Sequence, residues 1–224
     1  MFDSLKLSDL SEGHTTVLRP PSNTRPAVWL IEKDEVRAVV KDFSVNRFFY
    51  RNIFGRFLVW REAKALKKLK GLKGVPGLFR VIGGLCLVIE AIPGKTLKQA
   101  QDGGRLPDGF FDDLKALVER FHKKGVAHCD LKKAENILLG NDGKPYVIDW
   151  AASISRSEFG LPFLDLIYKR FIKDDYNAIT KRKLVHAPEL VSPEEREEYL
   201  YQSRAERVIR AFRDKLRAFL KKVA

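Results

Sequence analysis

The sequence predicts an α+β protein of two lobes, with an N-terminal antiparallel sheet plus one helix and a mainly helical C-terminal lobe. Three observations predict it. Short segments rich in β-branched and apolar residues alternate with turns over residues 15–92. One segment among them has helical periodicity. Beyond residue 109 the pattern is mostly helical. We therefore predict that residues 1–92 form the first lobe and residues 93–224 the second.

Length and composition narrow the class of protein. The chain has 224 residues, which fits one large domain or two small lobes. Its hydrophobic fraction of 45% is too high for a disordered chain, and no apolar run is long enough to span a bilayer. The first residues carry no basic region ahead of an apolar stretch, so we expect no secretory signal. Cys86 and Cys129 alone provide neither a disulfide framework nor a four-thiolate zinc site, which favours a cytoplasmic protein.

The net charge of +13 predicts an anionic partner. Nucleic acid, a nucleotide phosphate, an acidic protein and an anionic lipid all meet this condition, and a merely basic surface is the plain alternative. Charge alone does not choose among them.

The first lobe opens with three expected strands. Thr15–Arg19 has a β-type composition, and Pro20–Pro26 is a turn by composition. Ala27–Ile31 and Val36–Val40 are rich in β-branched and apolar residues, and the polar connection between them is short. We expect these two segments to pair as adjacent antiparallel strands.

A helix and two more strands complete the first lobe. Phe57–Leu69 places apolar residues on one face and lysines on the other, and glycines follow it. Leu78–Ile82 and Leu85–Ile92 read as strands around a Gly-Gly turn. Pro93 and Gly94 then break the chain.

The second lobe is expected to begin with a loop and a helix. Gln99–Gly109 is loop-like, and Phe110–Lys124 is an amphipathic helix that a glycine ends. Two short strands follow, Ile137–Leu139 and Tyr146–Ile148, with an Asn-Asp-Gly turn between them. Ser192, which Pro193 follows, begins one capping box at a helix start. A second capping box begins at Ser203.

The polar residues around the two short strands carry the chemistry. Asp130 and Asn136 precede the first strand, and Asp149 follows the second. If the strands pair as a hairpin, these three side chains converge at one end of it. A carboxylate that orients and deprotonates a hydroxyl, together with oxygen ligands for Mg²⁺, is what phosphoryl transfer requires.

These residues resemble the motifs of the protein-kinase-like superfamily. His128-Cys129-Asp130-Leu131, with Asn136 after it, is similar to the catalytic loop H-R-D-L-x-x-x-N, and Ile148-Asp149-Trp150 resembles D-F-G with its glycine lost. Upstream, the segment that ends at Lys41 resembles V-A-I-K, and Glu62 follows at a fitting distance. The resemblance covers roughly residues 15–150 and implies a two-lobed protein-kinase-like fold.

The resemblance also implies a role for each residue. Asp130 would be the catalytic base, and Asn136 and Asp149 would hold Mg²⁺. Lys41, paired with Glu62, would grip the α- and β-phosphates of ATP. The segment Leu85–Gly94, with Glu90 and Ile92, resembles the hinge that holds adenine. Lys132 either neutralises the transferring phosphoryl group or is solvated, and the sequence favours neither.

Among kinase-like proteins the chain resembles small atypical members. The segment Glu90–Leu97, the I-D-W in place of D-F-G and the total length are similar to RIO-type kinases, the small kinase of the KEOPS complex and bacterial kinases of lipopolysaccharide-core Kdo or heptose. A sugar hydroxyl or a protein Ser/Thr hydroxyl is the acceptor that these families imply.

The sequence departs from the kinase pattern in two places. No G-x-G-x-x-G covers the phosphates, and we expect the turn Ser22–Arg25 to serve instead, with Arg25 as the basic side chain. Asn136 lies one position later after Asp130 than in the usual loop, so that a bulge absorbs the extra residue or Glu135 shares the metal role. These departures motivate the alternative of a catalytically silent pseudokinase or nucleotide-gated binding module.

The last segment of the chain adds a second proposal about partners. Between Arg204 and Val223, apolar residues recur at three- and four-residue intervals, and eight basic residues lie among them. This pattern fits a helix packed on the second lobe, and it also fits a basic amphipathic helix at an anionic membrane surface. Peripheral contact with the inner face of a membrane is therefore one expectation. Nucleic acid is not expected as a partner, because no recognised nucleic-acid-binding motif is present.

Overall fold

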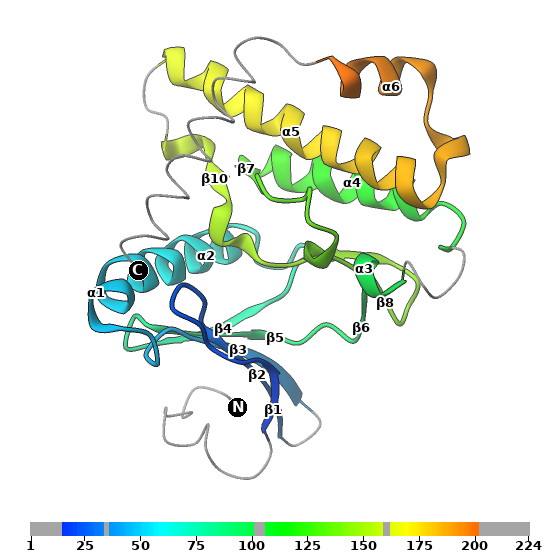
Figure 1. The fold of residues 1–224 in the computed structure, drawn as a ribbon. Helices are drawn as coiled ribbons and strands as arrows, with labels where there is room; N and C mark the ends of the chain where they lie inside the picture. The colour runs from blue at the N-terminus through cyan, green and yellow to red at the C-terminus, as the bar shows by residue number, and fades with distance from the viewer. Residues whose placement is uncertain (1–14, 34–35, 101–105, 159–161, 202–224) are drawn as a thin grey trace.

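The computed structural model describes residues 15–33, 36–100, 106–158 and 162–201, and it has the two-lobed α+β architecture that the sequence predicts (Figure 1). The sheet and helix α2 of the first lobe lie at the bottom of the view, and helices α4, α5 and α6 lie at the top. The elements of the first lobe are β1 (Thr15–Arg19), β2 (Ala27–Lys33), β3 (Val36–Asp42), α1 (Phe48–Tyr50), the π-helical segment η3 (Arg51–Gly55), α2 (Arg56–Lys68), β4 (Leu78–Ile82) and β5 (Cys86–Glu90).

The first lobe is built on an antiparallel sheet in the order β1-β2-β3-β5-β4. The hairpin expected between β2 and β3 forms, with Val28 opposite Lys41 and Ala38 opposite Ile31. Strand β3 also pairs with β5, which places Lys41 opposite Leu87. Lys41 therefore lies on a central strand, where both neighbours fix the position of its backbone. Strand β5 ends at Glu90, two residues before the predicted end.

The helix of the first lobe begins earlier than the sequence predicts. We expected it to start at Phe57, but helical structure runs without a break from Phe48 through α1, η3 and α2. Large apolar side chains are exposed along this added stretch, so it lacks the one-sided pattern by which a packed helix is recognised. Gly55 makes the contact with the sheet possible, because an added Cβ would lie 3.0 Å from the Cβ of Phe43.

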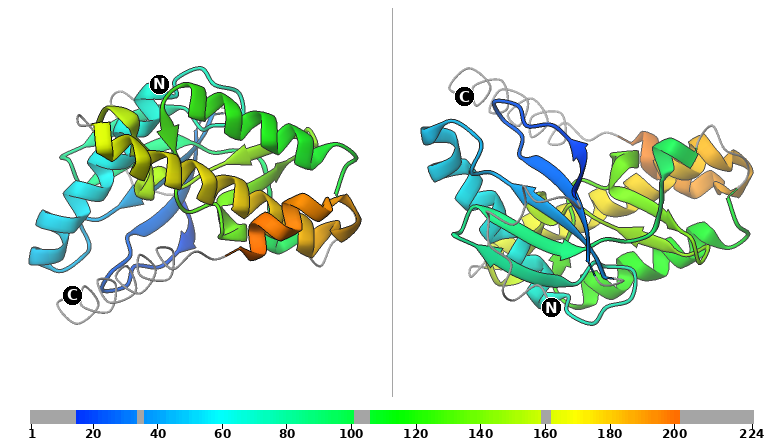
Figure 2. Two further views of the ribbon diagram at one scale, coloured as in Figure 1. Left: turned by 90° about the horizontal axis from the view of Figure 1, so that it is seen from above. Right: turned by 90° about the horizontal axis from the view of Figure 1, so that it is seen from below.

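The second lobe contains four helices and two small sheets in its described part. Its elements are β6 (Gly94–Thr96), α3 (Leu97–Ala100), α4 (Phe110–Lys123), β7 (Val126–Ala127), η4 (Ala134–Asn136), β8 (Ile137–Gly140), β9 (Pro145–Val147), η5 (Trp150–Ala152), β10 (Ile154–Ser155), η6 (Arg156–Glu158), α5 (Pro162–His186), η7 (Pro188–Leu190) and α6 (Pro193–Leu200). Helices α4 and α5 lie side by side (Figure 2). The expected hairpin is present as β8 and β9, within a sheet of order β6-β8-β9.

The second lobe agrees with the sequence-based expectations only in part. The predicted loop Gln99–Gly109 begins inside helix α3, which follows the short strand β6. Helix α5, the longest described helix, was not predicted. The capping box at Ser192 is present at the start of α6, with both of its hydrogen bonds. The segment from Ser203 to Val223 lies outside the described residues.

One apolar core joins the two lobes. It contains Leu66 of α2 and Leu69 just after it, Leu117 and Phe121 of α4, and the fully buried Trp150. Because α2 packs directly on η5, the helix that carries Glu62 contacts the segment that follows Asp149. No helix within the described ranges is long and apolar enough to cross a membrane.

Candidate active site

Three charged side chains from distant parts of the chain meet between the lobes. The Nζ atom of Lys41 donates to both carboxylate oxygens of Glu62, at 2.8 and 2.9 Å. The same Nζ atom lies 2.7 Å from Oδ1 of Asp149. The ion pair predicted between Lys41 and Glu62 is therefore present in the structure, and Asp149 joins it.

Burial and charge act in opposite directions on this cluster. Burial alone would lower the pKa of Lys41, but the carboxylates of Asp149 and Glu62 together raise it above its ordinary value. The ammonium of Lys41 lowers the pKa of Asp149 to about 2. Burial raises the pKa of Glu62, although Lys41 opposes that shift. At neutral pH Lys41 and Asp149 are therefore a charged pair.

The backbone on either side of Asp149 explains how its carboxylate reaches the cluster. Asp149 lies just after β9 and has a left-handed φ of 64°. The next residue, Trp150, donates its backbone N–H to Oε1 of Glu62 at 3.2 Å, and its indole donates to the carbonyl of Val147 at 3.1 Å. Trp150, which stands where D-F-G has phenylalanine, thus fills the core. Its backbone also links the segment that follows Asp149 to α2.

The hairpin of β8 and β9 brings the catalytic-loop residues to the same end. The backbone N–H of Ile148 donates to the carbonyl of Asn136 at 2.9 Å. The Asn136 amide donates to the Asp130 carbonyl at 3.0 Å and lies 3.4 Å from Asp130 Oδ2. Since Nδ2 is used in this way, Oδ1 of Asn136 is the atom available to a ligand. The extra residue of the loop is accommodated in the 3₁₀ turn Ala134–Asn136.

A buried aspartate of α5, which was not predicted as a functional residue, holds this loop. Asp175 is fully buried and accepts hydrogen bonds from the backbone N–H groups of His128 and Cys129, at 2.8 and 2.9 Å. Its Oδ2 also lies 3.0 Å from Nε2 of His122. Cys129 has a φ of 67°, which two anchored amides help to maintain. No sequence motif marks Asp175, because α5 has no clear apolar stripe.

The contacts of His128 are structural. Its Nε2 lies 2.9 Å from the carbonyl of Ile148, and its Nδ1 lies 3.3 Å from the backbone N–H of Asp130. The ring packs on Trp150 with centroids 4.7 Å apart. Burial lowers the pKa of His128. A neutral ring with its proton on Nε2 satisfies both contacts, so His128 links the catalytic loop to the strand before Asp149.

The two lysines after Asp130 point to different partners. Lys132 lies 2.9 Å from Oδ1 of Asp174 on α5. Lys133 forms an ion pair with Asp130 itself. The structure therefore places Lys133, one residue beyond the predicted Lys132, beside the candidate base. The order of the two lysines in the sequence does not show which of them lies beside Asp130.

A cleft of about 490 Å³ lies between the sheet of the first lobe and the β8–β9 hairpin. Five of the predicted site residues line it, namely Lys41, Glu90, Ile92, Asn136 and Asp149. Arg25 is exposed on the β1–β2 turn and is not among the residues that line the cleft. Arg19, at the end of β1, does line it, and its buried Nε has no hydrogen-bond partner among the described residues. Arg19 is thus the cation of this turn region that faces the cleft.

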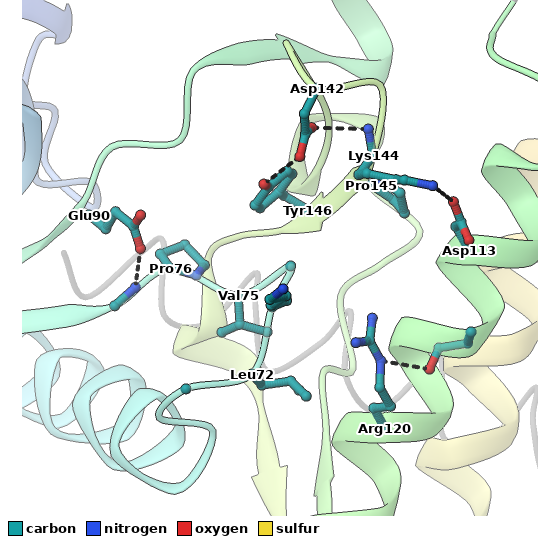
Figure 3. Close-up of a pocket in the computed structure, with 15 residues that line it drawn as sticks. Leu72, Val75, Pro76, Glu90, Asp113, Arg120, Asp142, Lys144, Pro145 and Tyr146 are labelled. Atoms are coloured by element: carbon teal, nitrogen blue, oxygen red, sulfur yellow. Dashed lines mark hydrogen bonds and ion pairs between the residues drawn. The ribbon is translucent and has the colours of Figure 1, made fainter.

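A second, larger cavity of about 820 Å³ shares Pro76 and Glu90 with this cleft, and Figure 3 shows the residues that line it. The Glu90 carboxylate points into the larger cavity and accepts the backbone N–H of Gly77 at 2.9 Å. Beside that cavity Lys144 pairs with Asp113 at 2.8 Å, and the Asp142 carboxylate accepts a hydrogen bond from the Tyr146 hydroxyl at 2.9 Å. The cleft is the better candidate for chemistry, because Lys41, Asn136 and Asp149 line it and none of them lines the larger cavity.

Neither cysteine has the properties of a nucleophile. Cys129 lies next to Asp130, but burial and the nearby carboxylates of Asp175 and Asp174 raise its pKa well above the ordinary value. Burial raises the pKa of Cys86 to about 12. Both thiols stay protonated at neutral pH, and a thiol is a much weaker nucleophile than a thiolate.

The oxygen atoms at the base of the cleft fit a nucleotide-bound Mg²⁺. Asp149 supplies a carboxylate with a lowered pKa, and Asn136 supplies an amide oxygen. No group of three or more His, Cys, Asp or Glu side chains in the described part of the chain could hold a metal by itself. This donor set suits a cation that binds through one or two protein oxygens and takes its other ligands from phosphates and water.

The fold and this arrangement of Lys41, Glu62, Asp130, Asn136 and Asp149 define an atypical protein-kinase-like protein. The comparison with family models gives the particular family. The model of the RIO domain matches residues 50–165, just over half of the chain. The chain therefore belongs to the RIO domain family.

Two curated relatives are similar to parts of the chain. The EKC/KEOPS complex subunit BUD32 of Encephalitozoon cuniculi is 41% identical over 101 residues, which are 44% of this chain and 49% of that protein. The serine/threonine-protein kinase PknD of Chlamydia trachomatis serovar D is 39% identical over 89 residues, which are 38% of this chain and 9% of that protein. The matches thus span about half or less of these relatives.

A solved structure supports the fold. The Rio2 kinase from Chaetomium thermophilum, crystallised as an ADP/Mg²⁺–phosphoaspartate complex, superposes with a TM-score of 0.58. The match covers 86% of this chain and 62% of that chain, at 17% sequence identity. The predicted kinase-like architecture is therefore confirmed.

Proposed function

We propose that the protein is an ATP- and Mg²⁺-dependent kinase that transfers the γ-phosphoryl group to a hydroxyl. The single observation that carries this proposal is the meeting of Lys41 with Glu62 and Asp149, within 2.9 Å, in the cleft that Asn136 also lines. In the kinase template a Lys–Glu pair and a metal-binding Asp must both be in place before transfer. Membership of the RIO domain family supports the proposal.

Asp130 is the proposed base. Its carboxylate would take the proton of the acceptor hydroxyl while that oxygen bonds to the γ-phosphorus, and the bond from phosphorus to the β,γ-bridging oxygen would break to release ADP. Lys133, which pairs with Asp130, is better placed than Lys132 to stabilise negative charge there. We therefore assign the role predicted for Lys132 to Lys133.

The other residues would bind and orient the nucleotide. Lys41 would hold the α- and β-phosphates, and Glu62 would keep Lys41 in position. Asn136 and Asp149 would hold Mg²⁺, which neutralises charge on the phosphate oxygens when it is bound. Glu90 and Ile92 line the side of the cleft where the hinge would receive adenine. Arg19, and not Arg25 as predicted, would be the basic side chain near the phosphates.

We propose a protein Ser/Thr hydroxyl as the acceptor. The curated relative PknD is named as a serine/threonine-protein kinase, and the superposed structure is a Rio2 kinase. The lipopolysaccharide-core sugar that the sequence also suggested has no counterpart among the similar proteins described above. A cytoplasmic location, with or without membrane contact through residues 204–223, remains part of the proposal.

The proposal is tested by measuring ADP release and γ-³²P transfer to casein and to the protein itself. Wild-type protein should transfer phosphate to serine or threonine in the presence of Mg²⁺. Asp130→Asn should abolish transfer and retain ATP binding, whereas Asp149→Asn should lose Mg²⁺-dependent nucleotide binding. Asp142→Asn, which changes an exposed carboxylate on the β8–β9 turn, is the matched control and should stay active.

The outcome also separates the kinase from its alternative. A protein that binds ATP and Mg²⁺ but never releases ADP, with protein or lipopolysaccharide-core acceptors, would be a nucleotide-gated binding module. Transfer to the sugar alone would keep the kinase and overturn the proposed acceptor. Full activity in Asp149→Asn would exclude the proposed metal ligand.

A further inference from the structure

The outer side of the first-lobe helix exposes an unusual number of large apolar residues. We name as the aromatic face the residues Phe48, Phe49, Ile53, Phe57 and Trp60. All five are between 49% and 76% exposed, and Phe49 is the most exposed of them. They lie on the helical run of α1, η3 and α2, at the left edge of the molecule in Figure 1. Contiguous exposed apolar surface of this kind marks a site of interaction.

The spacing of these residues brings them close together along one helical run. Phe49, Ile53 and Phe57 follow one another at four-residue intervals, and Trp60 follows three residues later. Within α2, residues three apart are neighbours on the helix surface, which places Phe57 beside Trp60; between Phe49 and Phe57 the run passes through the π-helical segment η3. The rings also contact one another, since Phe48 and Phe49 have centroids 5.7 Å apart and Phe57 and Trp60 have centroids 6.0 Å apart.

Basic residues surround this face and contact its rings. The guanidinium of Arg51 lies over Phe48 and that of Arg61 over Phe57, each with its Cζ 5.5 Å from the ring centroid. The ammonium of Lys64 lies 5.0 Å from the centroid of Trp60. Such cation–π contacts hold positive charge at the edge of the apolar surface. Other basic residues of the same segment are Arg47, Arg56, Lys67, Lys68 and Lys70.

Acidic residues contribute little to this side of the helix. Between residues 43 and 70 the only acid is Glu62, which is buried and turned inward to Lys41. Glu158 approaches from the second lobe and pairs with Arg61 and Lys64. The face therefore combines aromatic and aliphatic side chains with a strong excess of positive charge.

We propose that the aromatic face docks the protein on an anionic membrane surface. Aromatic side chains are enriched where a protein meets the boundary between lipid headgroups and acyl chains, and basic residues beside them are attracted to anionic headgroups. Charge complementarity favours this occupant. A second copy of the chain would bring two basic faces together, and the segment Arg204–Val223 is itself strongly basic. Both of these occupants would be repelled.

The inner side of the same helical run serves the cleft. Glu62 holds Lys41 there, and the hydroxyl of Tyr50 donates to the carbonyl of Thr24 on the β1–β2 turn at 2.8 Å. A membrane bound at the outer side would thus sit against the helix that positions the proposed phosphate-binding residues, and it would fix the orientation of the cleft relative to the bilayer.

Binding to vesicles without nucleotide tests the proposal independently of kinase activity. Full-length protein is sedimented with vesicles of phosphatidylcholine alone and of phosphatidylcholine with phosphatidylglycerol. We expect binding only to the anionic vesicles, weakening as salt rises. The double variant Phe49→Ser/Ile53→Ser should reduce binding at least tenfold. Leu190→Ser/Val185→Ser, which changes exposed apolar residues of the second lobe, should leave it unchanged.

Trp60 provides a direct reading of the contact. Its fluorescence should shift to shorter wavelength on anionic vesicles and be quenched by brominated acyl chains. Trp150 is fully buried and Trp29 lies on the sheet, so the variant Trp60→Phe should retain binding and lose the shift. Circular dichroism and the melting temperature of each variant check that it is folded.

Three results would overturn the proposal. Absence of binding to anionic vesicles at low salt would exclude the membrane, and an acidic protein partner would then become the occupant to seek. Binding that survives Phe49→Ser/Ile53→Ser but is lost in the full-length variant Arg210→Glu/Arg217→Glu would assign it to the C-terminal segment. A dimer in light scattering that Phe49→Ser/Ile53→Ser dissociates would identify a second copy as the occupant.

Discussion

The two walls of the cleft are held in place by different kinds of interaction. On the wall of the first lobe, Lys41 is positioned by two side-chain carboxylates, those of Glu62 and Asp149. On the wall of the second lobe, one buried carboxylate, that of Asp175, holds the catalytic loop by its backbone. In the charged cluster, a bound phosphate or cation would compete with the carboxylates for Lys41 or with Lys41 for Asp149. The loop is fixed before any ligand binds.

Among the changes that test this difference between the two walls, the largest loss of stability is expected from a substitution of Asp175. Asp175→Ala leaves the buried N–H groups of His128 and Cys129 without acceptors. Each such loss costs about 1–3 kcal/mol, so the free energy of unfolding should fall by about 2–5 kcal/mol. Urea denaturation measures this. Kinase activity should fall as well, because Asp130 follows the two released amides.

The neighbouring residue gives the control for that experiment. Asp174 makes a partly exposed ion pair with Lys132, and Asp174→Ala should lower stability by about 1 kcal/mol or less. Equal losses in the two variants would show that the loop is not anchored by Asp175.

A change in the charged cluster should affect binding more than stability. In Glu62→Gln the amide can still accept one hydrogen bond from Lys41, and Asp149 remains as the charged partner. We expect kcat/KM for ATP to fall about tenfold to a hundredfold, in line with the loss of a charged hydrogen bond. The melting temperature should change little. Steady-state kinetics at several ATP concentrations separates KM from kcat, and an unchanged KM would contradict the assigned role.

Acid should lower the stability of the protein through His128, which lies in the second-lobe wall of the cleft. The folded pKa of His128 is lowered below 6.5, so the unfolded chain binds the proton more readily. This contribution to stability is full above pH 6.5 and is lost as pH falls below that value. The slope is at most about 1.4 kcal/mol per pH unit for one group. Melting temperatures between pH 5 and 8 should therefore drop on the acid side.

A variant isolates the contribution of His128 from that of other histidines. Burial also lowers the pKa of His186, so the wild type carries both effects. His128→Phe retains a ring against Trp150 and should flatten the acid side of the profile, although its overall stability is lower. A profile as steep as that of the wild type would assign the pH dependence elsewhere.

The smallest predicted effect on stability concerns the β1–β2 turn, which contains no glycine. The β1–β2 turn is held from outside, by Tyr50 through Thr24 and by the Asn46 amide, which donates to the carbonyls of Ser22 and Arg25 at 2.6 and 3.0 Å. Tyr50→Phe removes one neutral hydrogen bond and should cost about 1 kcal/mol. Hydrogen exchange of the turn amides should rise in this variant. Unchanged exchange would mean that Asn46 suffices.

The sequence predicted those parts of the protein that follow a local pattern. The strands of the first sheet, the amphipathic helix α4 and the β8–β9 hairpin agree with the structure because each has a one-sided or alternating apolar pattern. The meeting of Lys41 with Glu62 came from resemblance to a known motif. The roles assigned to the site residues, including Asp130 and Asn136, remain predictions.

The parts that were missed depend on contacts between distant segments. Asp175 lies in a helix with charged residues on several sides, so its burial against the catalytic loop cannot be inferred from the helix alone. Lys132 and Lys133 are adjacent, and only the three-dimensional course of the loop decides which one reaches Asp130. Phe49 and Ile53 were not recognised as helical, because an exposed apolar surface gives no packing pattern.

The raised pKa values of the two thiols have a practical consequence. Since Cys86 and Cys129 both remain protonated at neutral pH, maleimide dyes and nitroxide reagents should react with them slowly. The natural chain is thus close to a cysteine-free background. A single cysteine introduced at Phe49 could be labelled selectively, so that the depth of insertion into a bilayer can be followed by fluorescence or electron spin resonance without first removing native residues. A pair of introduced cysteines, one in each lobe, would report the distance between the lobes in the same way.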